Sequence, residues 1–128
     1  MLPALTPSNS FFWKAGHDGR LKILRCDACG EWLHPPGPVC PACLSRDLTP
    51  RPVSGRATIE TYTINHQAWS ADLLVPYVVA IVSLEECSAV RLTTNVIDCA
   101  PEDVHIGDAV RVLFEQHGDV WLPLFVRT

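Results

Sequence analysis

The sequence predicts a mainly β protein in which a short N-terminal helix and a small cysteine-rich ribbon precede a five-stranded barrel. Two observations carry this prediction. Two Cys-x-x-Cys turns, residues 26–29 and 40–43, lie close together in the chain. Beyond residue 52 the apolar pattern changes to the alternation typical of half-buried strands. We therefore expect a helical segment over residues 1–19, the ribbon over 20–52 and the barrel over 53–128.

The helix is expected over residues 8–18, where a polar start precedes three consecutive aromatic side chains. Residues able to cap it are Ser8, Asn9 and Ser10. The aromatic run consists of Phe11, Phe12 and Trp13. One amphipathic helix cannot bury three consecutive large side chains on a single face, so something else must cover them. Two interpretations stay open: packing on the chain's own barrel, and contact with a partner protein or an apolar ligand.

The cysteine spacing indicates a metal site. Each turn brings two sulfurs close enough to bind one ion, and two such turns complete a tetrahedron suited to Zn²⁺. The predicted ligands are Cys26, Cys29, Cys40 and Cys43. Four thiolates leave no position for water or substrate, which predicts a structural zinc. Disulfide pairing is the alternative, and His34 is interpreted as an exposed loop residue rather than a substitute ligand.

Short segments frame the cysteine turns. Leu21–Arg25 is expected to be a strand that leads into the first turn. Gly30 directly follows that turn, where the backbone tends to need a conformation that glycine tolerates. The Thr-Pro-Arg-Pro segment at residues 49–52 is interpreted as a stiff connector that marks the end of the ribbon.

Five strands are expected in the barrel. In the first, residues 57–65, the alternation of apolar and polar residues is interrupted between Ile59 and Tyr62, which predicts a bulge or a strong bend. The second, residues 77–82, is continuously apolar, as expected of a strand covered on both faces. The others are expected near residues 90–96, 110–115 and 120–126, with one helical turn at 101–107. A bent first strand and a short helix between the third and fourth strands are the layout of an OB-type barrel.

Charge is unevenly divided along the chain, whose formal net charge is −4. Residues 1–56 carry seven Lys and Arg against four Asp and Glu, whereas residues 57–128 carry three against ten. The acidic half argues against a surface that follows a nucleic-acid backbone.

The N-terminal residues show no charged segment followed by a long apolar run, so we expect no signal peptide. No apolar stretch has the length of a membrane span. Together with thiol pairs at metal-binding spacing, this indicates a reducing, cytoplasmic setting. Cys87 and Cys99 are then expected to be small apolar residues in or near the core.

An ordered set of short motifs runs through nearly the whole chain. It comprises Phe12-Trp13, Arg25-Cys26-x-x-Cys29-Gly30, Pro35-Pro36, Cys40-Pro41-x-Cys43, Ser54-Gly55, Tyr62-Thr63-Ile64-Asn65-His66, Pro76-Tyr77-Val78-Val79-Ala80, Ile106-Gly107 and Leu122-Pro123-Leu124-Phe125. With this set the sequence resembles a family of small zinc-ribbon plus OB-fold proteins, long classed as a domain of unknown function, that accompany thiolase-like enzymes. One position departs from the family pattern, because Gly37 follows Pro35-Pro36 where an arginine is often found.

The resemblance implies a non-catalytic accessory subunit of an acyl-CoA enzyme complex, which helps bind the acyl-CoA and stabilises the assembly. Members pair with thiolases, with thiolase-like aldolases or acyltransferases, and with hot-dog-fold hydratases, in the handling of lipid, steroid or polyketide acyl chains. A hetero-oligomer and a coenzyme A thioester as ligand are implied with it. No nucleophile, base and orienting residue can be assembled from this sequence, so we predict no catalytic residues and expect them in the partner.

Candidate contact residues lie outside the metal site. His66 follows a predicted strand, where OB barrels place binding residues, and is interpreted either as a contact to a thioester or partner or as a surface histidine. Trp69 lies in the same apolar loop, for which docking on a partner, covering an acyl chain and self-burial stay open. Candidates for contacts to coenzyme A phosphates are Arg20, Lys22 and Arg25, together with Arg46, Arg51 and Arg56. The alternative is that these residues offset the charge of the zinc site and keep the surface soluble.

Two other functions stay open. Zinc ribbons and OB folds also serve as single-stranded nucleic-acid modules, although the acidic half and the lack of interleaved arginine and aromatic residues on the predicted strands count against this. A stand-alone enzyme or acyl-CoA carrier is the third hypothesis, and the filled zinc site gives it little support.

Overall fold

The computed structural model describes residues 2–128 and divides into two compact units. One unit runs up to Gly55 and also contains Phe114–Pro123, whereas the other comprises Arg56–Leu113 and Leu124–Thr128. Within the described residues, no helix has both the length and the apolar character needed to cross a membrane. The boundaries predicted after residues 19 and 52 stay predictions.

The N-terminal helix is shorter than the predicted segment of residues 8–18. Helix α1 spans Ser10–Lys14 and continues as the 3-10 turn η1, Ala15–Asp18. Asn9 does not cap α1, because its side-chain oxygen accepts a backbone N–H of the preceding turn at 2.7 Å. Gly19 then ends the segment with a φ of 71°, a left-handed conformation that glycine adopts without strain.

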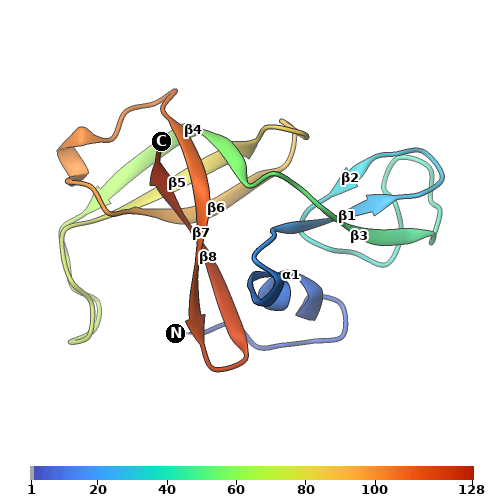
Figure 1. Cartoon of the computed structure of the whole chain (residues 1–128), viewed down its shortest axis with the longest axis horizontal. Coiled ribbons are helices and arrows are strands. Elements are labelled where there is room, and N and C mark those ends of the chain that lie inside the picture. The colour runs from blue at the N-terminus through green and yellow to red at the C-terminus, as the bar shows by residue number, and fades with distance from the viewer. Residues whose placement is uncertain (1) are drawn as a thin grey trace. The chain divides into compact units, whose positions relative to one another are not determined.

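Three short antiparallel strands form the ribbon in the order β2-β1-β3 (Figure 1). They are β1 Lys22–Cys26, β2 Trp32–Leu33 and β3 Leu48–Pro52. The Thr-Pro-Arg-Pro segment, predicted to be a connector, is instead part of β3, with Pro50 opposite Leu24. Proline is tolerated there because β3 lies at the edge of this sheet and needs no amide donor on its outer side.

Two residues of the aromatic run, Phe11 and Phe12, pack on the ribbon. Phe12 is buried, and its ring lies 4.9 Å from the ring of His34. Phe11 packs against the ribbon core, and Trp13 meets Phe12 edge to face at 4.9 Å. The interpretation of His34 as an exposed loop residue is therefore wrong, since the side chain is half-buried against α1.

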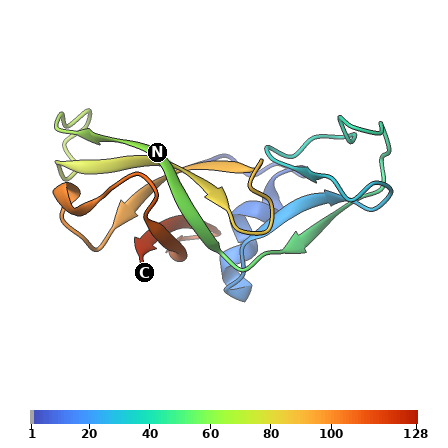
Figure 2. The same cartoon turned by 90° about the horizontal axis from the view of Figure 1, so that it is seen from above.

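Five strands close into a barrel in the order β4-β5-β6-β8-β7 (Figures 1 and 2). They are β4 Arg56–Asn65, β5 Tyr77–Leu84, β6 Arg91–Ile97, β7 Ala109–His117 and β8 Val120–Arg127, with the 3-10 turn η2 Pro101–Asp103 between β6 and β7. The pairing of β4 with β5 shifts register between Ile59 and Thr61, which confirms the predicted bulge. The predicted mainly β fold, with a helix, a cysteine ribbon and an OB-type barrel, is confirmed.

The barrel core follows the two-residue period of its strands. In β5, Val78, Ala80 and Val82 are buried, whereas the residues between them are half-buried. The prediction that residues 77–82 are covered on both faces therefore holds fully for the face that points to the core, whereas the other face is only half covered. The two cysteines outside the ribbon are buried or half-buried, as predicted: Cys87 and Cys99.

The end of the β7–β8 hairpin belongs to the same unit as the N-terminal helix. A methyl group added to Gly16 would lie 2.4 Å from Cβ of Trp121 and 2.7 Å from the ring of Phe114. His17 also meets Trp121 edge to face at 5.4 Å. Only a residue without a side chain fits η1 against the hairpin at this point.

Candidate metal centre

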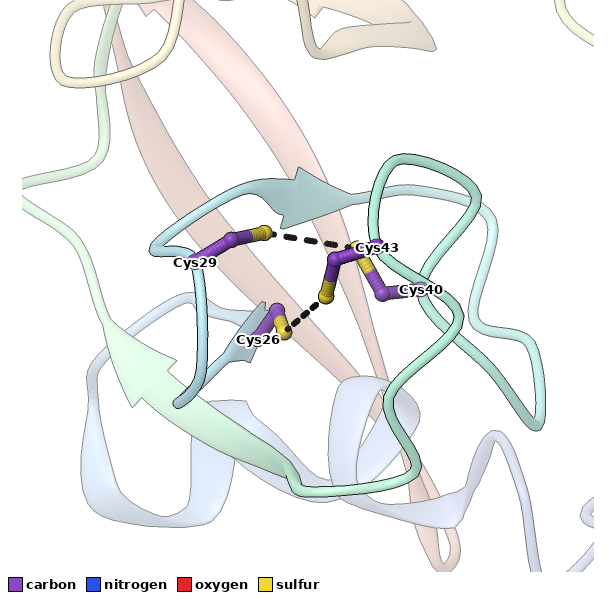
Figure 3. A group of neighbouring side chains, drawn as sticks. All are labelled: Cys26, Cys29, Cys40 and Cys43. Carbon is purple, nitrogen blue, oxygen red and sulfur yellow. Dashed lines mark hydrogen bonds between the residues drawn. The ribbon is translucent and has the colours of Figure 1, made fainter.

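Four cysteine sulfurs converge in the ribbon, as Figure 3 shows. All four Sγ atoms lie within 4.8 Å of one another. The closest pairs join the two turns, at 3.5 Å for Cys26 and Cys43 and 3.6 Å for Cys29 and Cys40. In a tetrahedral site with Zn–S bonds of about 2.3 Å, neighbouring sulfurs stand about 3.8 Å apart. The sulfur geometry therefore fits a four-thiolate zinc site, and all four cysteines are free of disulfide bonds.

The two cysteine turns share one backbone design. The N–H of Gly30 donates to the C=O of Cys26 at 2.9 Å, and the N–H of Leu44 donates to the C=O of Cys40 at 2.8 Å. Both donors are left-handed, with φ of 81° at Gly30 and 65° at Leu44. Glycine adopts this conformation freely, whereas a side chain costs about 1–2 kcal/mol there. The second turn therefore carries backbone strain that the first does not.

The sulfurs differ in their burial and in their readiness to ionise. Cys26 and Cys40 are buried in the small ribbon core, whereas Cys29 and Cys43 are exposed. A backbone hydrogen bond from Cys29 to the sulfur of Cys26 outweighs the opposing effect of burial and lowers the pKa of Cys26 to about 7. The thiolate is the form that binds zinc, so Cys26 is the sulfur most ready for the metal at neutral pH. In the same turn a backbone hydrogen bond from Glu31 lowers the pKa of Cys29, but the hydrogen bond with Cys40 and burial outweigh it and raise that pKa to about 12.

A polar clamp, made by Asp27, Thr49 and Arg51, fixes the first turn to β3. The Asp27 carboxylate accepts the hydroxyl of Thr49 at 2.5 Å and the guanidinium of Arg51 at 2.9 Å. These bonds, with that from Thr49 the largest cause, hold the pKa of Asp27 below its usual value. Sequence reasoning missed the clamp, because only the pairing of β1 with β3 brings these residues together.

The basic residues near the ribbon have structural partners. Nε of Arg25 donates to the C=O of Gly30 at 3.1 Å, and its guanidinium lies 5.0 Å from the ring centroid of Trp32. Lys22 pairs with a carboxylate of η1 at 3.2 Å, and Arg20 is exposed. Arg25 thus braces the first cysteine turn, and the contacts of the three side chains to coenzyme A stay predictions.

His66 and Trp69 lie in the β4–β5 loop, residues 66–76, which extends beyond the strand ends in Figures 1 and 2. Asn65 fixes the base of this loop, because its amide donates to the Tyr77 hydroxyl at 2.5 Å and its carbonyl accepts a backbone N–H of the loop at 3.2 Å. Trp69 is 70% exposed and Leu74 is 90% exposed. Self-burial, one of the open interpretations, is therefore wrong for these two side chains.

Two domain families match consecutive parts of the chain. Residues 13–49 match the ChsH2 rubredoxin-like zinc ribbon domain, and residues 50–115 match the ChsH2 C-terminal OB-fold domain. This chain belongs to the ChsH2 family. The predicted resemblance to zinc-ribbon plus OB-fold proteins is thereby confirmed, and the cysteine site lies in the part that matches the ribbon domain.

Curated relatives of this ChsH2-family chain are subunits and scaffold proteins. It is 37% identical over 124 residues to the probable enoyl-CoA hydratase alpha subunit of Thermomonospora curvata, covering 96% of this chain and 38% of the relative. It is 32% identical over 127 residues to the 3-oxo-4,17-pregnadiene-20-carboxyl-CoA hydratase alpha subunit of Mycobacterium tuberculosis, covering 96% and 40%. It is 36% identical over 95 residues to a DUF35 domain-containing scaffold protein of Methanocaldococcus jannaschii, covering 73% and 66%. The chain thus spans about two fifths of the length of the two hydratase subunits.

A solved structure resembles the chain over nearly its whole length. The Ltp2-ChsH2(DUF35) aldolase contains a chain that is 35% identical, with a TM-score of 0.89 and coverage of 98% of both chains. The likeness includes the ribbon and the barrel together.

Proposed function

We propose that this ChsH2-family chain is a non-catalytic accessory subunit of a thiolase-like enzyme, and that it helps bind the acyl-CoA and stabilises the active assembly. The observation that carries the proposal is the likeness over 98% of both chains to a chain of the Ltp2-ChsH2(DUF35) aldolase. The scaffold proteins among its relatives support the same role.

The donor set of the metal centre supports a structural role. Zinc bound by the four cysteines would supply folding free energy to a ribbon whose own core is small. The four thiolates fill the tetrahedron, so the ribbon's residues hold shape rather than activate a substrate. A reducing, cytoplasmic setting is part of the proposal, because such thiolates persist where disulfides do not form.

The β4–β5 loop is the element we propose for docking on the enzyme subunit. Exposed apolar side chains on an anchored loop are typical of protein interfaces, in which aromatic residues are enriched. His66 stands at the start of this loop, and we propose that it contacts the partner or the thioester. Of the N-terminal aromatic residues, Trp13 is the one we propose as a partner contact, because Phe12 and Phe11 already pack on the ribbon.

Native co-purification from the source cell tests the proposal. The complex is isolated untagged, its components are identified by mass spectrometry, and zinc is measured in the same fraction. We expect a stoichiometric thiolase-like subunit, about one zinc per chain, and acyl-CoA turnover by the pair that the isolated chain does not show. A zinc-loaded monomer without a protein partner would contradict it.

A second candidate partner is a hot-dog-fold hydratase subunit. It is favoured by the two relatives that are named hydratase alpha subunits and that match 96% of this chain. The same co-purification separates the two, because it identifies the subunit directly. A salt-dependent shift on adding single-stranded DNA would instead favour a nucleic-acid module.

A further inference from the structure

Arginines are concentrated at two cavities of the second unit. That unit, Arg56–Leu113 and Leu124–Thr128, contains eight acidic residues, four arginines and no lysine. Three of the arginines line a groove of about 670 Å³ and a cavity of about 450 Å³, which share two residues in their walls. The arginines are Arg56, Arg111 and Arg127. An acidic unit thus gathers most of its positive charge at one place.

The strand register brings two of these cations face to face. Arg56 of β4 is directly opposite Arg111 of β7, and both are exposed, whereas the neighbouring Ala57 and Val110 are buried. Like charges directly opposite each other on one face of a sheet are destabilising. Within residues 2–128, Arg111 forms no ion pair, so its guanidinium is available to a ligand.

The third arginine is held in place by the barrel. Nε of Arg127 lies 3.3 Å from a carboxylate oxygen of Asp108, which restrains the guanidinium beside the smaller cavity. Two more carboxylates line the cavities, Glu85 in the groove and Asp98 in the smaller cavity, so that with Asp108 three carboxylates stand beside the three arginines.

The groove also contains hydroxyl groups, which are further hydrogen-bond donors for an anion. Four hydroxyls line the groove, and two of them already donate within the chain: Ser83 to Glu60 at 2.7 Å and Thr128 to the C=O of Ala109 at 3.3 Å. The hydroxyls of Thr58 and Ser88 can donate to a ligand. A tetrahedral phosphate offers three terminal oxygens to donors in different directions, whereas a carboxylate offers two in one plane. Small apolar residues, among them Ala57 and Ala109, complete the wall and leave room for more than the anion itself.

We propose that Arg111, with Arg56 and Arg127, binds a phosphate group at this surface of the barrel, either as free phosphate or carried by a small molecule. The inference does not rest on the proposed function. Of the coenzyme A contacts predicted from the sequence, Arg56 alone belongs to this site, whereas Arg20, Lys22 and Arg25 lie in the other unit.

Titration of the zinc-loaded full chain, followed by ¹H–¹⁵N NMR, tests the site. The probes are inorganic phosphate, adenosine 3′,5′-bisphosphate and, as a carboxylate, malonate. The test variants are Arg111→Gln and Arg127→Gln, each with its amide spectrum checked for a native fold. The matched control is Arg91→Gln, because Arg91 is the fourth arginine of the unit and lines neither cavity.

We expect saturable shifts at the residues that line the groove, and a loss of affinity of about tenfold for Arg111→Gln against less than about twofold for Arg91→Gln. Tighter binding of the bisphosphate than of inorganic phosphate would assign the site to a phosphorylated small molecule, and equal binding would assign it to free phosphate. Equal weakening by Arg91→Gln, equal binding of malonate, or no saturation with any phosphate probe would overturn the proposal.

Discussion

Leu44 occupies a backbone position in the second cysteine turn for which glycine is better suited. Its φ is 65° and its side chain is 74% exposed, so neither conformation nor burial accounts for a leucine there. In the first turn the equivalent position is Gly30. Backbone strain at an exposed residue does not stabilise the fold, so it is compatible with a role of Leu44 in contact with another molecule.

Two replacements of Leu44 separate the effect of backbone strain on stability from the effect of losing the side chain. Leu44→Ala removes the exposed side chain and keeps the left-handed strain, whereas Leu44→Gly removes both. We expect Leu44→Gly to be the more stable of the two by about 1 kcal/mol, because relief of the strain exceeds the added flexibility of the unfolded chain. Urea unfolding of the zinc-loaded variants measures the difference, and a less stable Leu44→Gly contradicts the assignment of strain.

Asp27 acts on the metal centre without being a ligand. It joins the first cysteine turn to β3 through Thr49 and Arg51, so its loss frees the turn that carries two sulfurs. We expect Asp27→Asn to weaken zinc binding by roughly tenfold or less, because the clamp is partly solvent-exposed. Competition with a chelator measures the affinity. The control is Asp47→Asn, which changes a nearby exposed carboxylate, and equal effects of the two variants would refute the clamp's role.

At the scale of elements, the packing of η1 on the β7–β8 hairpin depends on Gly16. We expect Gly16→Ala to lower the free energy of unfolding by about 1–3 kcal/mol, because the methyl group would overlap Trp121 and Phe114. Gly37→Ala is the matched control, since nothing lies within 4 Å of a Cβ added there. Denaturant unfolding measured by tryptophan fluorescence checks the prediction. A Gly16→Ala protein as stable as Gly37→Ala would show that the two elements separate freely.

The contact of α1 with the ribbon is expected to depend on pH. Burial against α1 lowers the pKa of His34 below the value of about 6.5 expected in the unfolded chain. The unfolded state therefore binds the proton more readily, and stability falls as the pH drops from about 6.5 towards the pKa of the folded state.

His34→Phe tests this dependence, because phenylalanine can keep the ring contact and cannot titrate. We expect the variant to gain stability relative to the wild type as the pH falls from about 7.5 to 5.5. Thermal unfolding with saturating zinc measures the stability of both proteins at each pH. Because both proteins have the same cysteines, the effect of cysteine protonation is the same in each and drops out of the difference. If the stability difference between the two proteins stays constant over this pH range, His34 does not make stability depend on pH.

At the scale of the whole molecule, local signals were enough to predict the fold class. Cysteine spacing placed the metal centre, and strand alternation, with the phase slip after Ile59, placed the barrel and its bulge. Features set by pairing between distant segments were not predictable in this way. The strand formed by residues 48–52 exists because β1 pairs with it, and Asp27 meets Arg51 for the same reason. Similarly, no local pattern shows that residues 114–123 group with the helix.

Assembly with a partner is the property that belongs to the molecule as a whole, and the β4–β5 loop is where we expect it to depend on single side chains. Trp69 is exposed on a loop whose base is fixed by Asn65 and Tyr77, so it can enter a partner's surface without a large loss of loop entropy.

We expect Trp69→Ser to lower affinity for the co-purified enzyme subunit at least about tenfold while leaving the melting temperature unchanged. The control is Ile106→Ser, which removes another exposed apolar side chain of the same unit. Biolayer interferometry measures the binding of both variants to the enzyme subunit. Equal loss of affinity in both would point to general surface apolarity rather than to Trp69. A fall in the melting temperature of Trp69→Ser alone would assign the residue to folding instead.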